Sequence, residues 1–175
     1  KLTPDDPVKR AKMRSWLRFF EEVPTPAVRY PSFEQVLLRH YAKLSNEELD
    51  VQAESRPLKT EFYKTMGTDG FEKRHLDKAM GDMRLTVDRM EKELSENGPW
   101  LIGEHYTIAD ICVAPLIDRM EDLGHEYLWK DTHPHVVDWF KRMKARPAYT
   151  MAYYHGARFS QIYPDLNLPG KRMPS

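Results

Sequence analysis

The most restrictive feature of the sequence is an apolar stripe between residues 71 and 96. Its members are separated alternately by four and three residues: Leu76, Met80, Met83, Val87, Met90 and Leu94. This spacing places the side chains on one face of a single helix, which buries them by packing lengthwise against other helices. A free coiled coil is the weaker alternative, because the flanking sequence supplies helices to cover the stripe. We therefore predict a long helix from about Phe71 to Glu96.

The sequence before this stripe also predicts helices. Asp6 is a suitable N-cap, and Pro7 fits the first helical position, where its missing N–H costs nothing. A helix is therefore expected over residues 7–23. Three prolines between residues 24 and 31 predict that the chain then forms a loop.

Two capping boxes follow this predicted loop. In each, a serine stands three residues before a residue whose side chain can bond back to it, as Ser32 does with Gln35 and Ser45 with Glu48. A further short helix is expected to end at Gly67, because glycine readily adopts the left-handed conformation that ends helices. The sequence up to the stripe is therefore helical, apart from the predicted loop.

The sequence after the stripe predicts helices over residues 108–123 and 133–146, and a last short one over 147–159. No β-hairpin or βαβ pattern appears. The fold class is therefore all-α, a helical bundle of about seven or eight helices. Residues 1–160 form its domain, and residues 161–175 form an irregular C-terminal tail.

The stretch "GEHYTIADICVAP" carries the strongest helix-start signal. Thr107 at the N-cap and Asp110 three residues later form a capping box, and the carboxylate suits the positive end of the helix dipole. Tyr106 and Ile111 occupy the positions of a hydrophobic staple, and Gly103 permits a close approach of the chain. The capping role accounts for Asp110 without any catalytic one.

The helix that follows is expected to be buried and, because of its internal Pro115, bent. Cys112 is then a buried structural thiol rather than a nucleophile, since burial raises a thiol pKa. His133 and His135 flank a proline, but no cysteine or acidic cluster accompanies them. We expect surface histidines and no metal site.

Composition limits the partners and the compartment. Lys+Arg and Asp+Glu both number 27, so the basic excess typical of nucleic-acid binding is absent. One cysteine excludes an internal disulfide, and no run of about 18 apolar residues predicts a membrane span. We expect a cytoplasmic protein that binds neither nucleic acid nor membrane. The start at Lys1, without initiator Met or signal region, suggests a portion of a longer protein.

Two stretches, "GPWLIGEHYTIADICVAPLIDRM" and "HPHVVDWFKRMKARPAY", resemble the C-terminal helical domain of glutathione transferases. The capping box after a glycine, the mid-helix proline and the later "RPA" carry the resemblance, which covers roughly Pro4 to Tyr154. "DPVKRAKMR" and "KLSNEEL" are similar to bacterial members of the β-aryl-ether-cleaving type. The thioredoxin-like half of such enzymes, with its thiol-activating residue and most of the glutathione site, has no counterpart in this sequence.

The resemblance implies roles for particular residues. The first helix and the C-terminal segment would line an apolar substrate site, with core packing as the alternative role. The candidates are Met13, Trp16, Phe19, Phe20, Tyr154 and Phe159. Arg14 is the candidate for a glutathione carboxylate, by bidentate hydrogen bonds. No residue of this chain is expected to be catalytic.

The resemblance also implies a function, with glutathione as co-substrate. The intact protein would be a detoxifying homodimer that attacks a hydrophobic or aromatic electrophile with the glutathione thiolate, by conjugation or thioether-forming cleavage. This segment alone is expected to be inactive. The alternative is a non-catalytic interaction module of a larger assembly, as similar domains are in translation factors and tRNA synthetase complexes.

Overall fold

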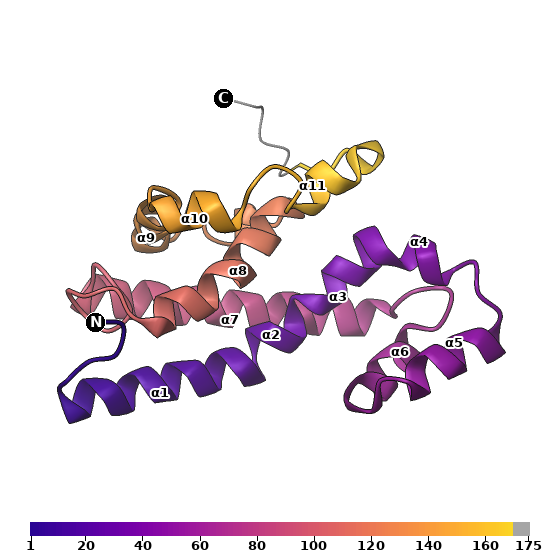
Figure 1. Cartoon of the computed structure of the whole chain (residues 1–175), viewed down its shortest axis with the longest axis horizontal. Helices are drawn as coiled ribbons and strands as arrows, with labels where there is room; N and C mark the ends of the chain where they lie inside the picture. The colour runs from indigo at the N-terminus through magenta and orange to yellow at the C-terminus, as the bar shows by residue number, and fades with distance from the viewer. Residues whose placement is uncertain (170–175) are drawn as a thin grey trace.

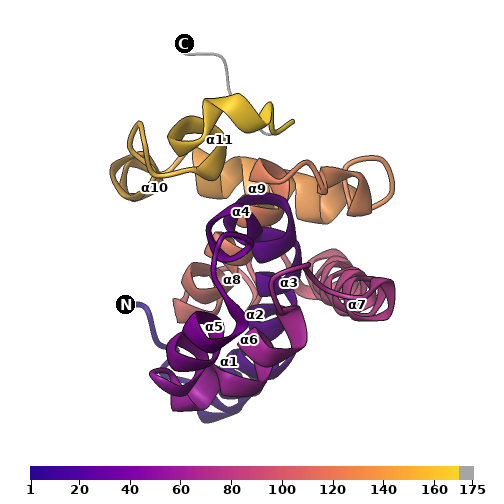
Figure 2. The same cartoon turned by 90° about the vertical axis from the view of Figure 1, so that its right-hand side faces the viewer.

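The computed structural model describes residues 1–169, and within them the chain is helical, with no β-strand and one isolated bridge between Trp100 and Gly103. The longest elements are α1 (Pro7–Glu22), α7 (Lys73–Asn97), α8 (Ile108–Asp122) and α9 (Pro134–Lys144). In both views α9, α10 (Pro147–Ala152) and α11 (Phe159–Ile162) lie on one side of α8, and α1 lies on the other (Figures 1 and 2). The predicted all-α class is confirmed.

The main core forms where α7, α8, α1 and α9 meet. The predicted stripe contributes its C-terminal four members to this core, whereas Leu76 and Met80 are only partly buried. The other helices add Trp16 and Phe20 from α1 and Trp139 from α9. Burying side chains of this size is the dominant favourable term in folding. Helix α7 is therefore packed lengthwise, as its spacing predicts.

The predicted loop after α1 is wrong. Residues 24–41 continue as short helical turns: α2 (Pro24–Ala27), α3 (Arg29–Ser32), the π-helical turn η1 (Phe33–Leu37) and α4 (Leu38–Tyr41). Pro24 stands at the first position of α2, where a proline removes no hydrogen bond. Ser32 is not an N-cap, because its hydroxyl donates to the Val28 carbonyl at 2.7 Å.

A second, smaller core lies at the end of the molecule remote from the N-terminus (Figure 1). It is enclosed by α5 (Asn46–Glu54), the 3-10 turn η2 (Pro57–Lys59) and α6 (Thr60–Met66). The capping box of Ser45 and Glu48 is present at the start of α5. Gly67 ends α6 with a φ of 60°, a left-handed conformation that favours glycine. Both local predictions are confirmed.

The C-terminal segment returns across the molecule. After the 3-10 turn η3 (Glu126–Leu128) and helices α9 and α10, it forms α11 and the 3-10 turn η4 (Pro164–Leu166). Leu168 then packs in a small cluster with Val36 and Leu123. The predicted irregular tail thus contains the end of α11 and η4, and its residues 170–175 lie outside the described part. No helix of residues 1–169 is both long and apolar enough to span a membrane.

Candidate functional site

The N-terminus of α8 is fixed by the side chain of Asp110. This carboxylate is fully buried and accepts four hydrogen bonds, from the N–H of Leu101 at 3.1 Å, the Trp139 indole at 2.9 Å, and the N–H and hydroxyl of Thr107 at 2.9 and 3.1 Å. Burial raises the pKa of Asp110, and these hydrogen bonds oppose the rise. The structure contains the predicted capping box, and Asp110 also binds Leu101 earlier in the same connection and Trp139 on α9. No oxygen of Asp110 is left to meet a substrate.

The approach to α8 depends on the backbone conformation of Gly103. Its φ is 103°, which side chains other than glycine rarely adopt. The nearest atoms to an added Cβ would lie 3.8–3.9 Å away, an ordinary contact distance. Glycine is therefore required for its conformation rather than for the close approach that the sequence predicts.

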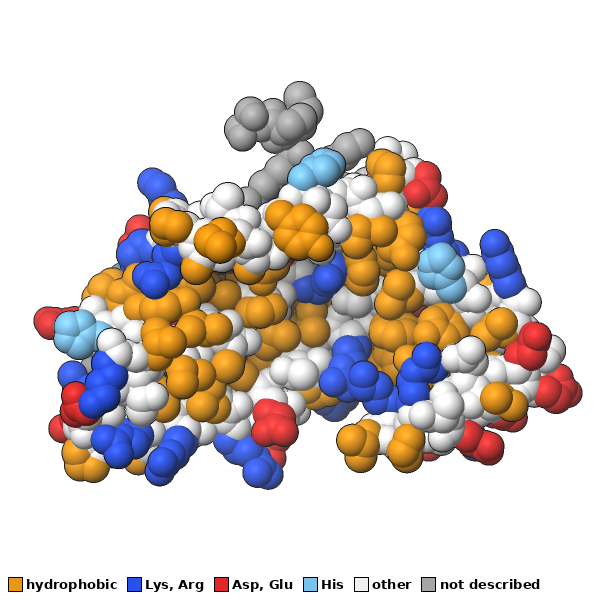
Figure 3. All heavy atoms as spheres, viewed as in Figure 1, with side chains coloured by type: hydrophobic (Ala, Val, Ile, Leu, Met, Phe, Trp, Pro, Cys, Tyr) orange, Lys and Arg blue, Asp and Glu red, His pale blue; other side chains and the backbone are white. Residues whose placement is uncertain are grey.

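One side of α8 is uncovered by the rest of the chain. Ile111, Cys112 and Pro115 are exposed there, while Val113 and Ile117 are buried on the opposite side. The predicted burial of Cys112 is therefore wrong, although its partial burial still raises the pKa of the thiol. The sequence misled because α8 is apolar around most of its circumference, which predicts burial on every side. Figure 3 shows the resulting apolar face over α8, between α1 and α10.

A groove of about 300 Å³ lies along this face. Its lining comes from α8, α9, α10 and the loop before α8, and is mostly apolar: Tyr106, Ile111, Ala114, Pro115, Met143, Arg146, Ala148, Tyr149, Ala152 and Tyr153. The rings of Tyr149 and Tyr153 lie 4.4 Å apart between centroids. Burial raises the pKa of Tyr153 to about 12, so its hydroxyl stays protonated at neutral pH. An apolar groove with few polar groups is the usual form of a small-molecule site.

The groove borders a buried ionic network around Arg158. This guanidinium donates to the Glu121 carboxylate at 2.8 Å and to the Asp118 carboxylate at 3.3 Å. Tyr149 donates its hydroxyl to the same Asp118, and Lys144 donates to Glu121. Burial alone would lower the pKa of Arg158, but these carboxylates outweigh it and raise the pKa. The network thereby holds a groove residue and the C-terminal segment in place.

The next carboxylate on α8 fixes the start of α11. Asp122 is fully buried and accepts from the N–H of Phe159 at 2.7 Å and of Ser160 at 3.3 Å. Above Phe159 lies the guanidinium of Arg119, 3.5 Å from the ring centroid. Sequence reasoning missed Arg119, Tyr149 and Tyr153. The i, i+4 spacing of the two tyrosines in "AYTMAY" is the signal that marks a shared face.

The predicted substrate residues do not form one site in the described chain. Met13, Trp16 and Phe20 are buried in the main core, which fits the core-packing alternative. Phe19 is partly buried, with the guanidinium of Arg89 4.3 Å from its ring centroid. The other three candidates lie elsewhere or in solvent: Phe159 beneath Arg119, Tyr154 with 66% exposure, and Arg14 exposed on α1. Their roles toward substrate and glutathione stay predictions.

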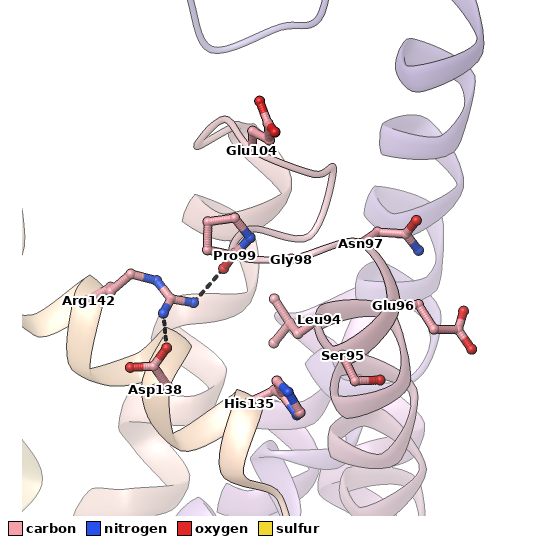
Figure 4. A pocket seen from close by; sticks show the side chains of 10 residues that line it. All are labelled: Leu94, Ser95, Glu96, Asn97, Gly98, Pro99, Glu104, His135, Asp138 and Arg142. Atoms are coloured by element: carbon pink, nitrogen blue, oxygen red, sulfur yellow. Dashed lines mark hydrogen bonds and ion pairs between the residues drawn. The ribbon is translucent and has the colours of Figure 1, made fainter.

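A larger hollow of about 460 Å³ lies at the C-terminal end of α7. Figure 4 shows Glu104 pointing in a different direction from Glu96 and Asn97 there. Arg142 is occupied, because it donates to Asp138 and to the Pro99 carbonyl. These side chains do not converge on a common point, so we favour the apolar groove as the functional site.

The two histidines flanking Pro134 anchor α9 to α7. His133 bonds to Asp88 at 2.7 Å and is buried, contrary to the prediction of a surface residue. His135 is exposed and bonds to Glu91 at 2.7 Å. Among residues 1–169 no group of three potential metal ligands comes together.

Comparison with known families decides the family of this chain. The family "Glutathione S-transferase, C-terminal domain" matches residues 47–147, more than half of the sequence. The chain belongs to this family. The matched span includes α7, α8 and α9, with the Asp110 capping box and most of the groove. Residues 148–153, which complete the groove in this glutathione S-transferase domain, follow directly after it.

Individual relatives agree with this assignment. LigF of Sphingobium sp. strain SYK-6 is 28% identical over 152 residues, which are 84% of this chain and 59% of LigF. The crystal structure of the β-etherase LigF matches with a TM-score of 0.73 and 26% identity, over 87% of this chain and 65% of that one. The glutathione S-transferase domain described here is thus similar to LigF in sequence and in fold.

Two further relatives carry different names. The tetrachloro-p-hydroquinone reductive dehalogenase of Sphingobium chlorophenolicum is 24% identical over 161 residues, 85% of this chain and 62% of the dehalogenase. Elongation factor 1-gamma 1 of Saccharomyces cerevisiae is 28% identical over 115 residues, 65% of this chain and 26% of that protein. This chain therefore spans less than two thirds of the length of LigF, the dehalogenase and the elongation factor.

Proposed function

We propose that this chain is the helical half of a bacterial, cytoplasmic glutathione S-transferase that acts on aromatic electrophiles. The observation that carries the proposal is the apolar groove beside the uncovered face of α8. The groove of about 300 Å³ is large enough for an aromatic ring, which would stack favourably on the tyrosine rings of its wall. The names of two relatives support this substrate class, because one is a β-etherase and the other acts on a chlorinated hydroquinone.

The uncovered face of α8 is the proposed docking surface for a thioredoxin-like half. Cys112 would be covered by it, which removes apolar surface from water, and Ile111 and Pro115 would line the groove enclosed between the two halves. The N-terminal segment supports this placement. The Leu2 carbonyl accepts from the Ile108 N–H at 3.1 Å, and Lys1 shares a hollow with Tyr106 and Arg146. A polypeptide joined to Lys1 would thus emerge beside the groove.

The division of chemistry follows from this arrangement. Glutathione, held mainly by the other half, supplies a thiolate that attacks the electrophilic carbon in the groove. A carbon–sulfur bond forms, and in a displacement the leaving group departs with its bonding electrons. This chain supplies the apolar wall that orients the electrophile, which raises the rate by positioning. It supplies no thiol activator, so the helical half by itself would be inactive.

The test uses the full-length protein that contains this chain, assayed with glutathione and 1-chloro-2,4-dinitrobenzene or an aryl ether ketone. Tyr153→Ala removes one wall of the groove and is expected to raise KM severalfold. The matched control is Tyr127→Ala, which removes an exposed tyrosine outside the groove and should leave KM unchanged. A protein that neither binds glutathione nor turns over either compound would contradict the proposal.

The second candidate function is a non-catalytic interaction module, favoured by the likeness to elongation factor 1-gamma 1. Glutathione affinity separates the two functions, since a module without the thiol chemistry has no use for it. We also propose a homodimer built partly from α1 and α7. It is supported by Leu85, which is 51% exposed between charged residues on the outer side of α7.

A further inference from the structure

We propose that Arg119, with the hydroxyl of Tyr153, makes one end of the groove a recognition site for an anionic oxygen. The preferred electrophile would then be an aromatic compound that carries a carboxylate, sulfonate or phenolate group. This inference rests on the proposed function, because it names the substrate class of the same groove. Arg119 is assigned as a specificity-determining residue and has no role in bond making.

The position of Arg119 follows from the helical repeat of α8. It lies four residues after Pro115, so both side chains leave the same side of the helix. Pro115 and Tyr153 line the groove, and Tyr153 interacts electrostatically with Arg119. Figure 3 shows basic side chains where the apolar face ends beneath α11. Arg119 is not itself one of the residues that line the groove, but its contact with the ring of Phe159 and its interaction with Tyr153 place it beside the end of the groove nearest α11.

The hydrogen bonding of Arg119 is incomplete. A guanidinium has five N–H donors, and the one described bond among residues 1–169 runs from Nη1 to Asp122 Oδ2 at 3.4 Å. That distance exceeds the usual range for such a bond. Asp122 also accepts from the backbone N–H groups of Phe159 and Ser160. Arg119 therefore has donors available to a ligand.

Arg119 differs from the neighbouring Arg158 in how far its side chain is buried and paired. The Arg158 side chain is 4% exposed and bonded to Asp118 and Glu121, which fixes it inside the protein. The Arg119 side chain is 27% exposed, although desolvation still lowers its pKa. The carboxylates of Asp118 and Asp122 are buried, whereas the Arg119 side chain beside them remains partly open to solvent. Arg146 also lines the groove, so an anion bound there can meet two guanidinium groups.

The surroundings of Arg119 strengthen its attraction for an anion. Its guanidinium lies over the ring of Phe159, which removes water from one of its faces. Charge-assisted hydrogen bonds are stronger where water is partly excluded. The Tyr153 hydroxyl is protonated at neutral pH, with a pKa raised by burial to about 12, and so adds a neutral donor. The two residues offer an oxygen anion one charged and one neutral donor.

The test measures binding of two fluorescent probes to the protein. One is 1-anilinonaphthalene-8-sulfonate, and the other is N-phenyl-1-naphthylamine, which has the same rings without the sulfonate. Arg119→Met is expected to weaken the sulfonate probe about tenfold, equivalent to ~1.4 kcal/mol, and the neutral probe less than twofold. Arg119→Lys should retain part of the preference, and Tyr153→Phe should weaken only the sulfonate probe. The sulfonate preference should also fall with rising salt.

The matched control is Arg39→Met. Arg39 stacks over Tyr163 at 4.7 Å and pairs with Asp165, so it clamps the same C-terminal segment away from the groove. If Arg119 merely holds α11 in place, both variants will weaken both probes alike, and the inference is wrong. The inference is also wrong if Arg119→Met leaves sulfonate binding intact. Binding of neither probe to the wild-type protein would refute the groove itself, whereas binding of the neutral probe alone would refute only the role of Arg119.

Discussion

Replacing Asp110 by alanine is the sharpest test of how α8 is held. The variant removes an acceptor of four hydrogen bonds and leaves three buried N–H donors without it, on Leu101, Thr107 and Trp139. A capping interaction on the surface contributes about 1 kcal/mol, whereas each buried donor left unpaired costs roughly 1–3 kcal/mol. The variant should therefore lose far more stability than a cap alone provides.

The expected magnitude is about 3–4 kcal/mol at pH 7. The donors' costs do not add fully, because water and side-chain movement satisfy part of them. Removing Asp110 also relieves the burial of a charge, which is the cause of its raised pKa. For an acid whose pKa is raised on folding, the favourable contribution is present at low pH and lost as pH rises through the folded pKa. The loss of unfolding free energy in Asp110→Ala should accordingly be larger near pH 4 than near pH 7.

The assay compares urea and thermal unfolding of Asp110→Ala with those of Glu48→Ala. Glu48 holds the same position in the capping box of α5, but there the box is exposed to solvent. We expect the melting temperature to fall by about 10 °C for Asp110→Ala and by about 2 °C for Glu48→Ala, since a protein of this size shifts by ~2–4 °C per kcal/mol. Equal losses in the two variants would refute the argument from buried donors.

Four further outcomes are expected. Cys112 should react with Ellman's reagent in the folded helical half, more slowly than free cysteine because its pKa is raised, and faster as pH increases. Glu91→Ala should cost about 1–2 kcal/mol in urea unfolding, because Glu91 accepts from the Val136 N–H at 2.9 Å at the start of α9. Burial alone would raise the pKa of Glu121, but hydrogen bonds from basic neighbours lower it, so the protection of the α11 amides against hydrogen exchange, relative to the intrinsic exchange rate at each pH, should decrease as pH falls below the ordinary value of 4.5. Leu85→Lys should convert the proposed homodimer to a monomer in light scattering; an unchanged mass would argue against α7 as its interface.

The parts of the fold that could be predicted depend on neighbours close in sequence. The stripe of α7 has a period that only a helix satisfies, and the serine of α5 stands three residues before its glutamate. Gly67 and Asp6 mark helix ends by their own conformational or hydrogen-bonding preferences. Each signal is complete within one or two turns, so no knowledge of the tertiary fold is needed.

The prolines of residues 24–31 show where such local signals fail. A proline ends a helix when it stands inside one, but it fits equally well in the first turn of another. In this chain the turns of α2 and α3 follow α1 almost without interruption, and α2 packs against α7. That packing stabilises short helices which propensity alone would not predict. The sequence contains the prolines, but the choice between loop and helical turn depends on packing against α7, which begins 46 positions after the end of α2.

The groove required the same long-range information. Its walls come from α8, α9, α10 and a loop, which are separate in the sequence. Tyr149 can be placed in the groove only once the fold brings Asp118 on α8 close enough to accept the hydrogen bond of its hydroxyl. The sequence does not show which of Arg119 and Arg158 is buried against carboxylates, because Arg119 directly follows Asp118 and Arg158 has no acidic residue within six positions. Their exposures of 27% and 4% separate them. Burial is a property of the packed chain, so the assignment of roles has to follow the structure.

The exposure of Cys112 follows from which side of α8 the rest of the chain covers. Helix α8 is apolar on nearly all sides, and a helix of that kind is stable when it is covered on all sides. The rest of the chain covers the side of Val113 and Ile117 and leaves that of Cys112 open. The prediction of a buried thiol was therefore wrong for this chain, yet it would hold in a protein whose thioredoxin-like half lies on this face. Protection of Cys112 from Ellman's reagent in that longer protein, with reactivity in the helical half alone, is the result that the proposed docking surface requires.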